Sequence, residues 1–234
     1  MAEELRNIHS LFLEKLHKRY SLRQVRMKNP LPERPARGLG LIKMDGSLFE
    51  SDKFMRVMVL TSGIAFTSRC TRSIFLGPRP ELYLPIFSSE TILMGSKRAF
   101  LVDIHPTVRP ARWGELGLEP RMLAIRSRYA ELVAEPVPLE GKINDIMSPA
   151  YIYVHVPPDR DAMALSFFNE YLDLYLEMVD RAAPVAGADR QKSGEDFERY
   201  HDTVINHDPA VKLYGKLFGE RGAIERVNDI FFAR

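Results

Sequence analysis

The fold is decided by a run of short apolar segments, which read FMRVMVLTSG (54–63), IAFTSRCTRSIFL (64–76), ELYLPIF (81–87), ILMG (92–95) and AFLVDIH (99–105). They are rich in β-branched and aromatic residues, as strands are. Turn pairs such as Asp45-Gly46, Gly77-Pro78 and Gly95-Ser96 separate them, and no crossover helix fits between them. Strands joined by such short connections pair antiparallel, so we expect a meander of hairpins over about 39–105.

Helical patterns lie on both sides of this meander. Residues 3–21 repeat apolar side chains along one stripe, and the proline-rich connector NPLPERPAR follows at 29–37. Further along, we expect a helix at 120–134, a strand at 150–156, a loop at 184–194, and helices at 161–182, 195–206 and 209–232. Segregated strands and helices predict an α+β fold in which one antiparallel sheet is covered by helices.

Length and composition fit one soluble domain over residues 1–234. We divide it into an N-terminal amphipathic helix with its connector (1–37), a mainly antiparallel sheet (38–156) and a C-terminal helical layer (157–234). No apolar run is long enough for a membrane span, and the N-terminus lacks the continuous apolar stretch of a signal peptide. The single cysteine, Cys70, excludes an internal disulfide, and no Cys/His cluster has zinc spacing. We expect a cytoplasmic protein without a metal and without membrane insertion.

Charge is distributed unevenly along the chain. Residues 1–125 hold 20 Lys and Arg against 12 Asp and Glu, whereas residues 126–234 hold 13 against 19. This asymmetry predicts a basic face for an acidic partner, unless the two halves intermingle in the fold. Nucleic acid is disfavoured by a pI of about 8.6 and by the lack of a base-stacking motif. The candidate docking group for an acidic partner is Lys15, Lys18, Arg19, Arg23, Arg26 and Lys28.

The sequence contains no Rossmann, P-loop, zinc-protease or nucleophile-elbow motif. Asp103 is the first residue whose context suggests chemistry. It ends an apolar strand, and strand alternation places it on the same face as His105. On a covered face, burial raises the pKa of the carboxyl, while a neighbouring imidazolium lowers it. Such a pair can hold and deliver a proton near pH 7. The alternative is an aspartate at the strand edge that accepts turn hydrogen bonds.

Asp208 is the second candidate. It stands directly before Pro209 at a predicted helix start, which is typical of a helix N-cap followed by proline at the first helical position. The functional interpretation is a second carboxylate that reaches from the helical layer toward the sheet. One residue can serve both purposes.

Several short motifs, in this order and spacing, resemble those of the ferredoxin-dependent bilin reductases. They are FMR (54–56), LPIF (84–87), DIHP (103–106), NHDP (206–209), KLFG (216–219) and FF (231–232). The resemblance covers roughly residues 38–234. It implies a three-layer α/β/α sandwich whose central antiparallel sheet is covered by helices on both faces, with biliverdin IXα bound between the sheet and the C-terminal helices. It also implies no tightly bound cofactor, single electrons from an external [2Fe–2S] ferredoxin, protons from the protein, and a haem oxygenase upstream.

The resemblance assigns roles to individual residues. Asp103 matches the family's sheet aspartate, the expected proton donor, and Asp208 matches the aspartate of the helical layer. His105 has no counterpart, and its placement makes it a candidate proton relay or hydrogen-bond donor to a lactam carbonyl. Phe87 of the LPIF motif is assigned to substrate contact.

Basic groups at the mouth of the pocket are candidates for binding the bilin propionates. Lys212 lies one turn into the helix after Asp208, and His155 lies on the strand at 150–156. The alternative for both is a solvated or structural side chain.

The sequence departs from the family in two places. Ser88, Ser89 and Glu90 follow Phe87 where the family often has G-x-D. The Glu/His pair that phycocyanobilin-forming members place ahead of the sheet aspartate has no match, and Glu81 is the nearest carboxylate.

The expected function is ferredoxin-dependent reduction of biliverdin IXα to a phycobilin-type product. The alternative is a non-catalytic tetrapyrrole carrier with the same fold, since a fold does not fix an activity.

Overall fold

One seven-stranded sheet forms the centre of the computed structural model, which describes residues 5–234 except 34, 36–40, 96, 135 and 140. The strands follow chain order, and every neighbouring pair is antiparallel. They are β1 (Arg23–Val25), β2 (Ile42–Glu50), β3 (Phe54–Ile64), β4 (Cys70–Pro78), β5 (Ile86–Met94), β6 (Lys97–His105) and β7 (Ile152–His155). The predicted antiparallel meander is confirmed. The start of the predicted N-terminal helix and parts of the predicted connector at 29–37 lie outside the described residues.

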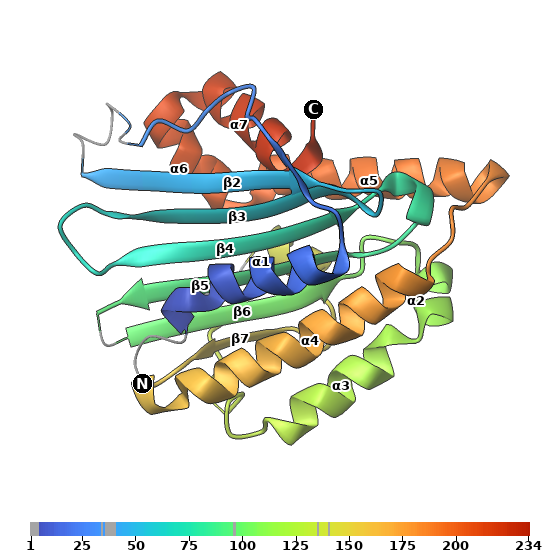
Figure 1. Ribbon diagram of the computed structural model, residues 1–234, viewed down its shortest axis with the longest axis horizontal. Coiled ribbons are helices and arrows are strands. Elements are labelled where there is room, and N and C mark those ends of the chain that lie inside the picture. The colour runs from blue at the N-terminus through green and yellow to red at the C-terminus, as the bar shows by residue number, and fades with distance from the viewer. Residues whose placement is uncertain (1–4, 34, 36–40, 96, 135, 140) are drawn as a thin grey trace.

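Helices cover the sheet on both faces. They are α1 (Ile8–Arg19), α2 (Pro110–Leu116), α3 (Leu118–Arg128), α4 (Asp161–Arg181), α5 (Gly187–His207), α6 (Pro209–Phe218) and α7 (Glu220–Phe232). Figure 1 views the sheet from the side of α1, α3 and α4, with α5–α7 on the other side. The result is the expected α+β fold, a three-layer α/β/α sandwich. We refer to its two sides as the α4 face and the α6 face.

The α4 face holds the larger apolar core. Phe87 of β5 packs against Phe168 and Tyr175 of α4, with ring centroids 5.9 and 5.5 Å apart. Successive turns of α4 point the same stripe at the sheet, because residues three or four apart share one side of a helix. All of these side chains are fully buried. Burial of each such aromatic ring stabilises the fold by roughly 1.5–3 kcal/mol.

Alternation along β6 separates the core from the polar site. Phe100, Val102 and Ile104 enter the core of the α4 face. Asp103 and His105 therefore point to the α6 face, where the His105 ring lies 5.9 Å from the Tyr200 ring of α5. Along this part of β6, the side chains that enter the core of the α4 face are apolar, whereas the ionisable Asp103 and His105 lie on the α6 face.

Some sequence-based boundaries were wrong. Neither β1 nor α2 was expected, and the helix predicted at 120–134 ends at Arg128. The helical segment predicted at 209–232 is interrupted at Gly219, a glycine that punctuates it in the sequence and that separates α6 from α7 with a φ of +79°, a conformation that favours glycine. The loop predicted at 184–194 is also wrong, because α5 begins at Gly187.

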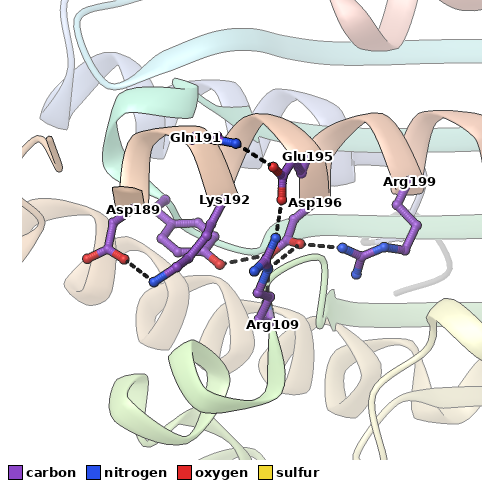
Figure 2. A network of polar contacts seen from close by, with 8 residues as sticks. Arg109, Asp189, Gln191, Lys192, Glu195, Asp196 and Arg199 are labelled. Atoms are coloured by element: carbon purple, nitrogen blue, oxygen red, sulfur yellow. Dashed lines mark hydrogen bonds and ion pairs between the residues drawn. The ribbon is translucent and has the colours of Figure 1, made fainter. Parts of the chain in front are cut away.

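The first turns of α5 are held by contacts to distant parts of the chain. The Asp196 side chain is buried and accepts hydrogen bonds from the Tyr83 hydroxyl (2.7 Å), the Arg109 backbone N–H (2.8 Å) and the Arg199 guanidinium (2.5 Å). Figure 2 shows Arg109 pointing up from its loop to Asp196 and Glu195 on the helix, with Arg199 on the other side. We call these residues the Asp196 network. It stabilises as helix a segment that the sequence alone predicts as loop.

Replacement of Asp196 by Asn is expected to lower thermal stability. An amide –NH₂ in place of one oxygen faces a donor and leaves a buried hydrogen bond unmade, which costs about 2–3 kcal/mol. For a chain of this size, the melting temperature should fall by roughly 5–10 °C in calorimetry. Asp189→Asn is the matched control on the same helix, since Asp189 forms only an exposed ion pair with Lys192 and should leave the melting temperature unchanged. Equal melting temperatures for the two variants would show that the network adds no stability.

Candidate functional site

Asp103 is the most deeply placed acid of the α6 face. Its side chain is 0% exposed, and it accepts hydrogen bonds from the Ser148 backbone N–H (2.8 Å) and the Ser148 hydroxyl (2.5 Å). Burial raises the pKa of Asp103, while the His105 charge and the Ser148 hydrogen bonds oppose that rise. The hydrogen bonds expected of a structural aspartate are present, and so is the burial expected of a proton donor.

The Ser148 hydroxyl can serve Asp103 in both protonation states. Its oxygen already accepts a hydrogen bond from the Ala150 backbone N–H at 3.1 Å. One acceptor position remains, so the 2.5 Å contact can be made by the serine proton when Asp103 is ionised or by the carboxyl proton when it is not. Asp103 can therefore give up and regain a proton without losing its position.

His105 connects Asp103 to the neighbouring strand. Its Nε2 lies 2.6 Å from the Ser88 hydroxyl, and its Nδ1 lies 3.3 Å from the Ile146 carbonyl and 3.5 Å from an Asp103 oxygen. A carbonyl only accepts, so we assign the ring proton to Nδ1, and Ser88 then donates to Nε2. Ser88, His105 and Asp103 thus form a line of proton-exchanging groups that leads from a partly exposed hydroxyl to a buried acid.

Asp208 faces the sheet from the start of α6. It is the N-cap of that helix and accepts a hydrogen bond from the Ala210 backbone N–H at 2.7 Å, with Pro209 in the first turn. Burial raises its pKa, while the capping hydrogen bond and the charge of His105 oppose that rise. The N-cap interpretation is confirmed, and the same carboxyl also lies within electrostatic reach of the sheet residues.

Glu90 is a third carboxyl on this face. It lies on β5 opposite Leu101 of β6, and the Ser73 hydroxyl of β4 donates to it at 3.0 Å. Burial and the negative charge of Asp208 raise the pKa of Glu90 to about 7. We refer to Glu90, Asp103, His105 and Asp208 as the acid cluster.

Tyrosines complete the surroundings of the acid cluster. Burial and the charges of Asp208 and Asp103 raise the pKa of Tyr200, so its hydroxyl stays protonated. The pKa of Tyr214 on α6 is raised by burial and by the charges of Glu90 and Asp208. Since each phenol responds to carboxylates of more than one element, the sheet and the helical layer contribute to one common site.

The sheet beneath the acid cluster is partly open. On the α6 face, Ser73, Glu90 and Leu101 are all partly exposed, although they lie on β4–β6 in the interior of the sheet, and so is Tyr153 on the edge strand β7. On the α4 face of the same strands, Ser89, Thr91, Phe100 and Val102 are at most 1% exposed. The helices therefore seal one face and leave part of the other accessible. This accessible area, which we call the floor, can lie against a flat ligand and donate protons to it.

Three predicted substrate-binding residues do not join the cluster. Phe87 is fully buried against α4 on the opposite face, because its neighbour Ser88 is the one that points to the α6 face; this corrects its assignment to substrate contact. His155 is exposed at the end of β7. Lys212 is exposed on α6. Asp103 and His105, by contrast, lie side by side as strand alternation predicted, and Asp208 lies within electrostatic reach of His105.

The N-terminal basic residues are largely paired. Four of the six candidate docking residues form ion pairs, namely Lys15 with Asp173, Lys18 with Glu14, Arg19 with Asp180 and Arg23 with Glu50. Two of these pairs, those of Lys15 and Arg19, join the basic half of the chain to the acidic half. This is the intermingling that was considered as the alternative to a basic face. The six residues therefore present less net positive charge than the sequence predicts.

The described part of the chain also has a hollow that lies apart from the acid cluster. A hollow of about 1080 Å³ opens beside β1–β4, and its lining mixes basic residues such as Arg26, Lys43 and Arg69 with Glu33 and Asp45. None of the acid cluster lines it. Among the described residues, no group of three or more His, Cys, Asp or Glu could hold a metal ion. No described helix combines the length and apolar character that crossing a membrane requires.

Sequence reasoning missed Glu90, Ser88 and Ser148. The apolar segments 81–87 and 92–95 read as two strands, so Glu90 fell between them, whereas β5 runs unbroken through it. No alternation of polar and apolar residues marks the strand here, because Ser88, Ser89, Glu90 and Thr91 are all polar. Ser148 carries no local signal, because only the return of the chain to β7 brings it to Asp103.

Comparison with known proteins gives consistent matches. The sequence profile of the family described as ferredoxin-dependent bilin reductase matches residues 12–233. A phycoerythrobilin:ferredoxin oxidoreductase of Synechococcus sp. (strain CC9902) is 21% identical over 189 residues, covering 78% of this chain and 73% of that protein. A 15,16-dihydrobiliverdin:ferredoxin oxidoreductase of Gloeobacter violaceus is 26% identical over 162 residues, covering 66% and 64%.

A solved structure matches over almost the whole chain. It is the crystal structure of phytochromobilin synthase from tomato in complex with biliverdin, with a TM-score of 0.80 and 18% sequence identity. The match covers 94% of this chain and 79% of the tomato protein. At this identity, the likeness establishes a common fold.

Proposed function

The chain belongs to the ferredoxin-dependent bilin reductases, and we propose that it reduces the linear tetrapyrrole biliverdin IXα to a phycobilin-type product with single electrons from a [2Fe–2S] ferredoxin. The observation that carries this proposal is the acid cluster, in which Asp103 lies buried beside the partly exposed floor and, like Asp208 of the helical layer, lies within electrostatic reach of His105. The biliverdin named in the tomato complex and the ferredoxin named for the cyanobacterial relatives support the substrate and the electron donor.

The acids have a defined task in such a reaction. Reduction of one double bond takes up two electrons and two protons, and each electron that enters a conjugated bilin leaves negative charge on it. A positioned acid lowers the barrier by donating a proton as that charge develops. Asp103 donates from the sheet, and Ser148 stabilises the carboxylate that remains. Asp208 donates from the helical side, where it meets a different part of the pigment.

His105 has a supporting role in this scheme. It lies between Ser88 and Asp103, so it can return a proton to Asp103 after each donation or donate a hydrogen bond to a lactam carbonyl. Lys212 and His155 stay predictions as groups that bind the propionates, and a haem oxygenase stays the predicted upstream source of the pigment.

An absorbance time course tests the function. The protein is mixed with biliverdin IXα, ferredoxin, ferredoxin reductase and NADPH at low oxygen, and the products are separated by chromatography beside known bilins. We expect the biliverdin absorbance to decay and a blue-shifted product to appear, because reduction shortens the conjugated system. The control omits ferredoxin. A bound spectrum that stays constant in the complete mixture would support the non-catalytic carrier instead.

A further inference from the structure

We propose that one end of the sheet is a docking surface for the anionic phospholipid surface of a membrane, on which the protein lies without spanning it. We call this end the hairpin tip. It consists of residues 41–43 at the start of β2, 64–69 between β3 and β4, and 94, 95 and 97 between β5 and β6. The inference does not depend on the proposed function and uses no residue of the acid cluster.

Large apolar side chains are more exposed at the hairpin tip than elsewhere. Among the described residues, eight large apolar side chains are exposed, and the four most exposed of them all belong to the tip. They are Phe66 (87%), Leu41 (51%), Met94 (46%) and Ile64 (44%). Single exposed apolar residues are ordinary on a protein surface, whereas a group of them marks an interaction site.

The strand pairing brings these side chains together. The Ala65 backbone N–H donates to the Leu41 carbonyl at 2.6 Å, which joins the start of β2 to the β3–β4 hairpin. The β4–β5 register pairs Cys70 with Leu93, which brings Met94 to the same hairpin. Figure 1 shows the start of β2, the β3–β4 hairpin and the end of β5 at one end of the sheet, on the left. The apolar group is therefore one surface.

The backbone at Phe66 points to a role outside the fold. Its φ is +64°, a left-handed conformation that glycine and asparagine adopt readily and that a bulky residue rarely adopts. The ring is 87% exposed, so little of its apolar surface is buried in return. A costly residue at an exposed turn is a reason to look for a function there. An aromatic side chain held out in this way can enter the headgroup region of a bilayer, as interfacial aromatic residues do.

The charge of the hairpin tip matches an anionic surface. Lys43, Arg69 and Lys97 are the charged side chains of its three segments, and all three are exposed. None of them forms an ion pair with another residue in the described part of the chain, in contrast to most of the basic group on and after α1. Lysine and arginine beside exposed apolar side chains are the combination that anionic lipids attract.

The hollow beside β1–β4 adjoins the hairpin tip and adds to its positive charge. The two share Lys43 and Arg69. Among the described residues that line the hollow, four are basic and two are acidic, namely Arg26, Lys43, Arg69, Arg72, Glu33 and Asp45. The tip and its surroundings therefore carry a net positive charge.

The position of the hairpin tip favours a membrane over two other occupants. Six residues of β6 separate Lys97 from Asp103, a distance of about 20 Å along the strand. An electron donor seated on the tip would be far from the acid cluster, and electron transfer slows steeply with distance. A second copy of the chain would bring like charges together, which opposes association. A lipid surface at the tip leaves the floor open to pigment and donor.

Phe66→Asn tests the apolar part of the surface. The full chain is sedimented with vesicles of equal parts phosphatidylglycerol and phosphatidylcholine, without biliverdin or ferredoxin. Wild type should bind, and Phe66→Asn should bind roughly tenfold less, because the aromatic contact with the interface is lost. Asparagine accepts the left-handed turn, so the melting temperature should not fall. Leu123→Asn, which removes an exposed leucine of α3, is the control and should bind as wild type does.

Arg69→Gln tests the charge. It should weaken binding to the anionic vesicles about fivefold, as expected for one basic side chain near the surface. Lys142→Gln is the control, because the exposed Lys142 lies on the turn Lys142–Ile146, which contacts His105 at the other end of β6. Wild-type binding should also weaken as salt is raised, and vesicles of phosphatidylcholine alone should bind much less.

Met94→Gln is a second apolar variant, on a different hairpin, and should weaken binding by a smaller factor than Phe66→Asn. Absence of wild-type binding to the anionic vesicles would overturn the proposal, as would equal binding by wild type, Phe66→Asn and Arg69→Gln. Equal binding to both kinds of vesicle would do the same. Ferredoxin binding or self-association that Phe66→Asn abolishes, without any vesicle binding, would assign the tip to a protein partner and also overturn it.

Discussion

Asp103→Asn is expected to bind biliverdin and to lose 10²–10⁴-fold in turnover, which is the usual contribution of a positioned general acid. Asparagine has the shape of aspartate, and its amide can still accept from the Ser148 backbone N–H and donate to the Ser148 hydroxyl. The fold and the pigment-binding surface should therefore persist. What is lost is the proton, so bilin radical species should accumulate once electrons enter.

The reaction is followed under low oxygen by stopped-flow absorbance and by electron paramagnetic resonance. A biliverdin titration measures binding separately. Asp145→Asn is the control, because Asp145 lies nearby on the exposed 3₁₀ turn Lys142–Ile146 and faces solvent. Turnover at the wild-type rate in Asp103→Asn would remove Asp103 as a donor. A parallel loss of biliverdin binding would assign it a structural role.

Asp208→Asn is expected to change the product or to stop the reaction at a partly reduced bilin, with little change in stability. Asparagine is as good an N-cap as aspartate, so the hydrogen bond from the Ala210 backbone N–H is retained. The variant thus removes the proton donor of the helical layer but keeps the start of α6. Chromatography of the products against known bilins is the measurement.

Asp208→Ala is the companion variant that separates the two roles. It removes the cap as well, which costs about 1 kcal/mol and should lower the melting temperature by roughly 2–4 °C. If Asp208→Asn makes the wild-type product at the wild-type rate while Asp208→Ala is only less stable, the residue is a cap and takes no part in the chemistry.

The sequence predicted the parts of this molecule that depend on local patterns. Alternation along AFLVDIH was sufficient to place Asp103 and His105 on one face, and the Asp208-Pro209 pair was sufficient to place a helix start. Both signals act over a few residues, because strand geometry and capping are local. The pairing of these residues across two layers came from the family resemblance, since no local pattern contains it.

The remaining features depend on contacts between distant segments. The polar and small residues of PVAGADRQKSG favour a loop, but Ser193 donates to the Pro80 carbonyl and Asp196 gathers its three partners, which stabilises the helix. Glu90 was missed for a related reason. Its strand is kept continuous by hydrogen bonds to β4 and β6 on both sides, and these compensate for the weak strand preference of Ser88, Ser89 and Glu90.

The unequal packing of the two faces of the sheet has a consequence for how such a protein can diversify. The aromatic layer beneath α4 carries the fold, and it faces away from the carboxyls that carry the chemistry. Substitutions at positions of β4–β7 on the α6 face can therefore relocate an acid, and with it the carbon that is hydrogenated. They do so without creating a cavity in the core beneath α4. Lineages built on this scaffold can acquire new pigments by exchanging a few side chains on one surface while the aromatic core of the other stays unchanged.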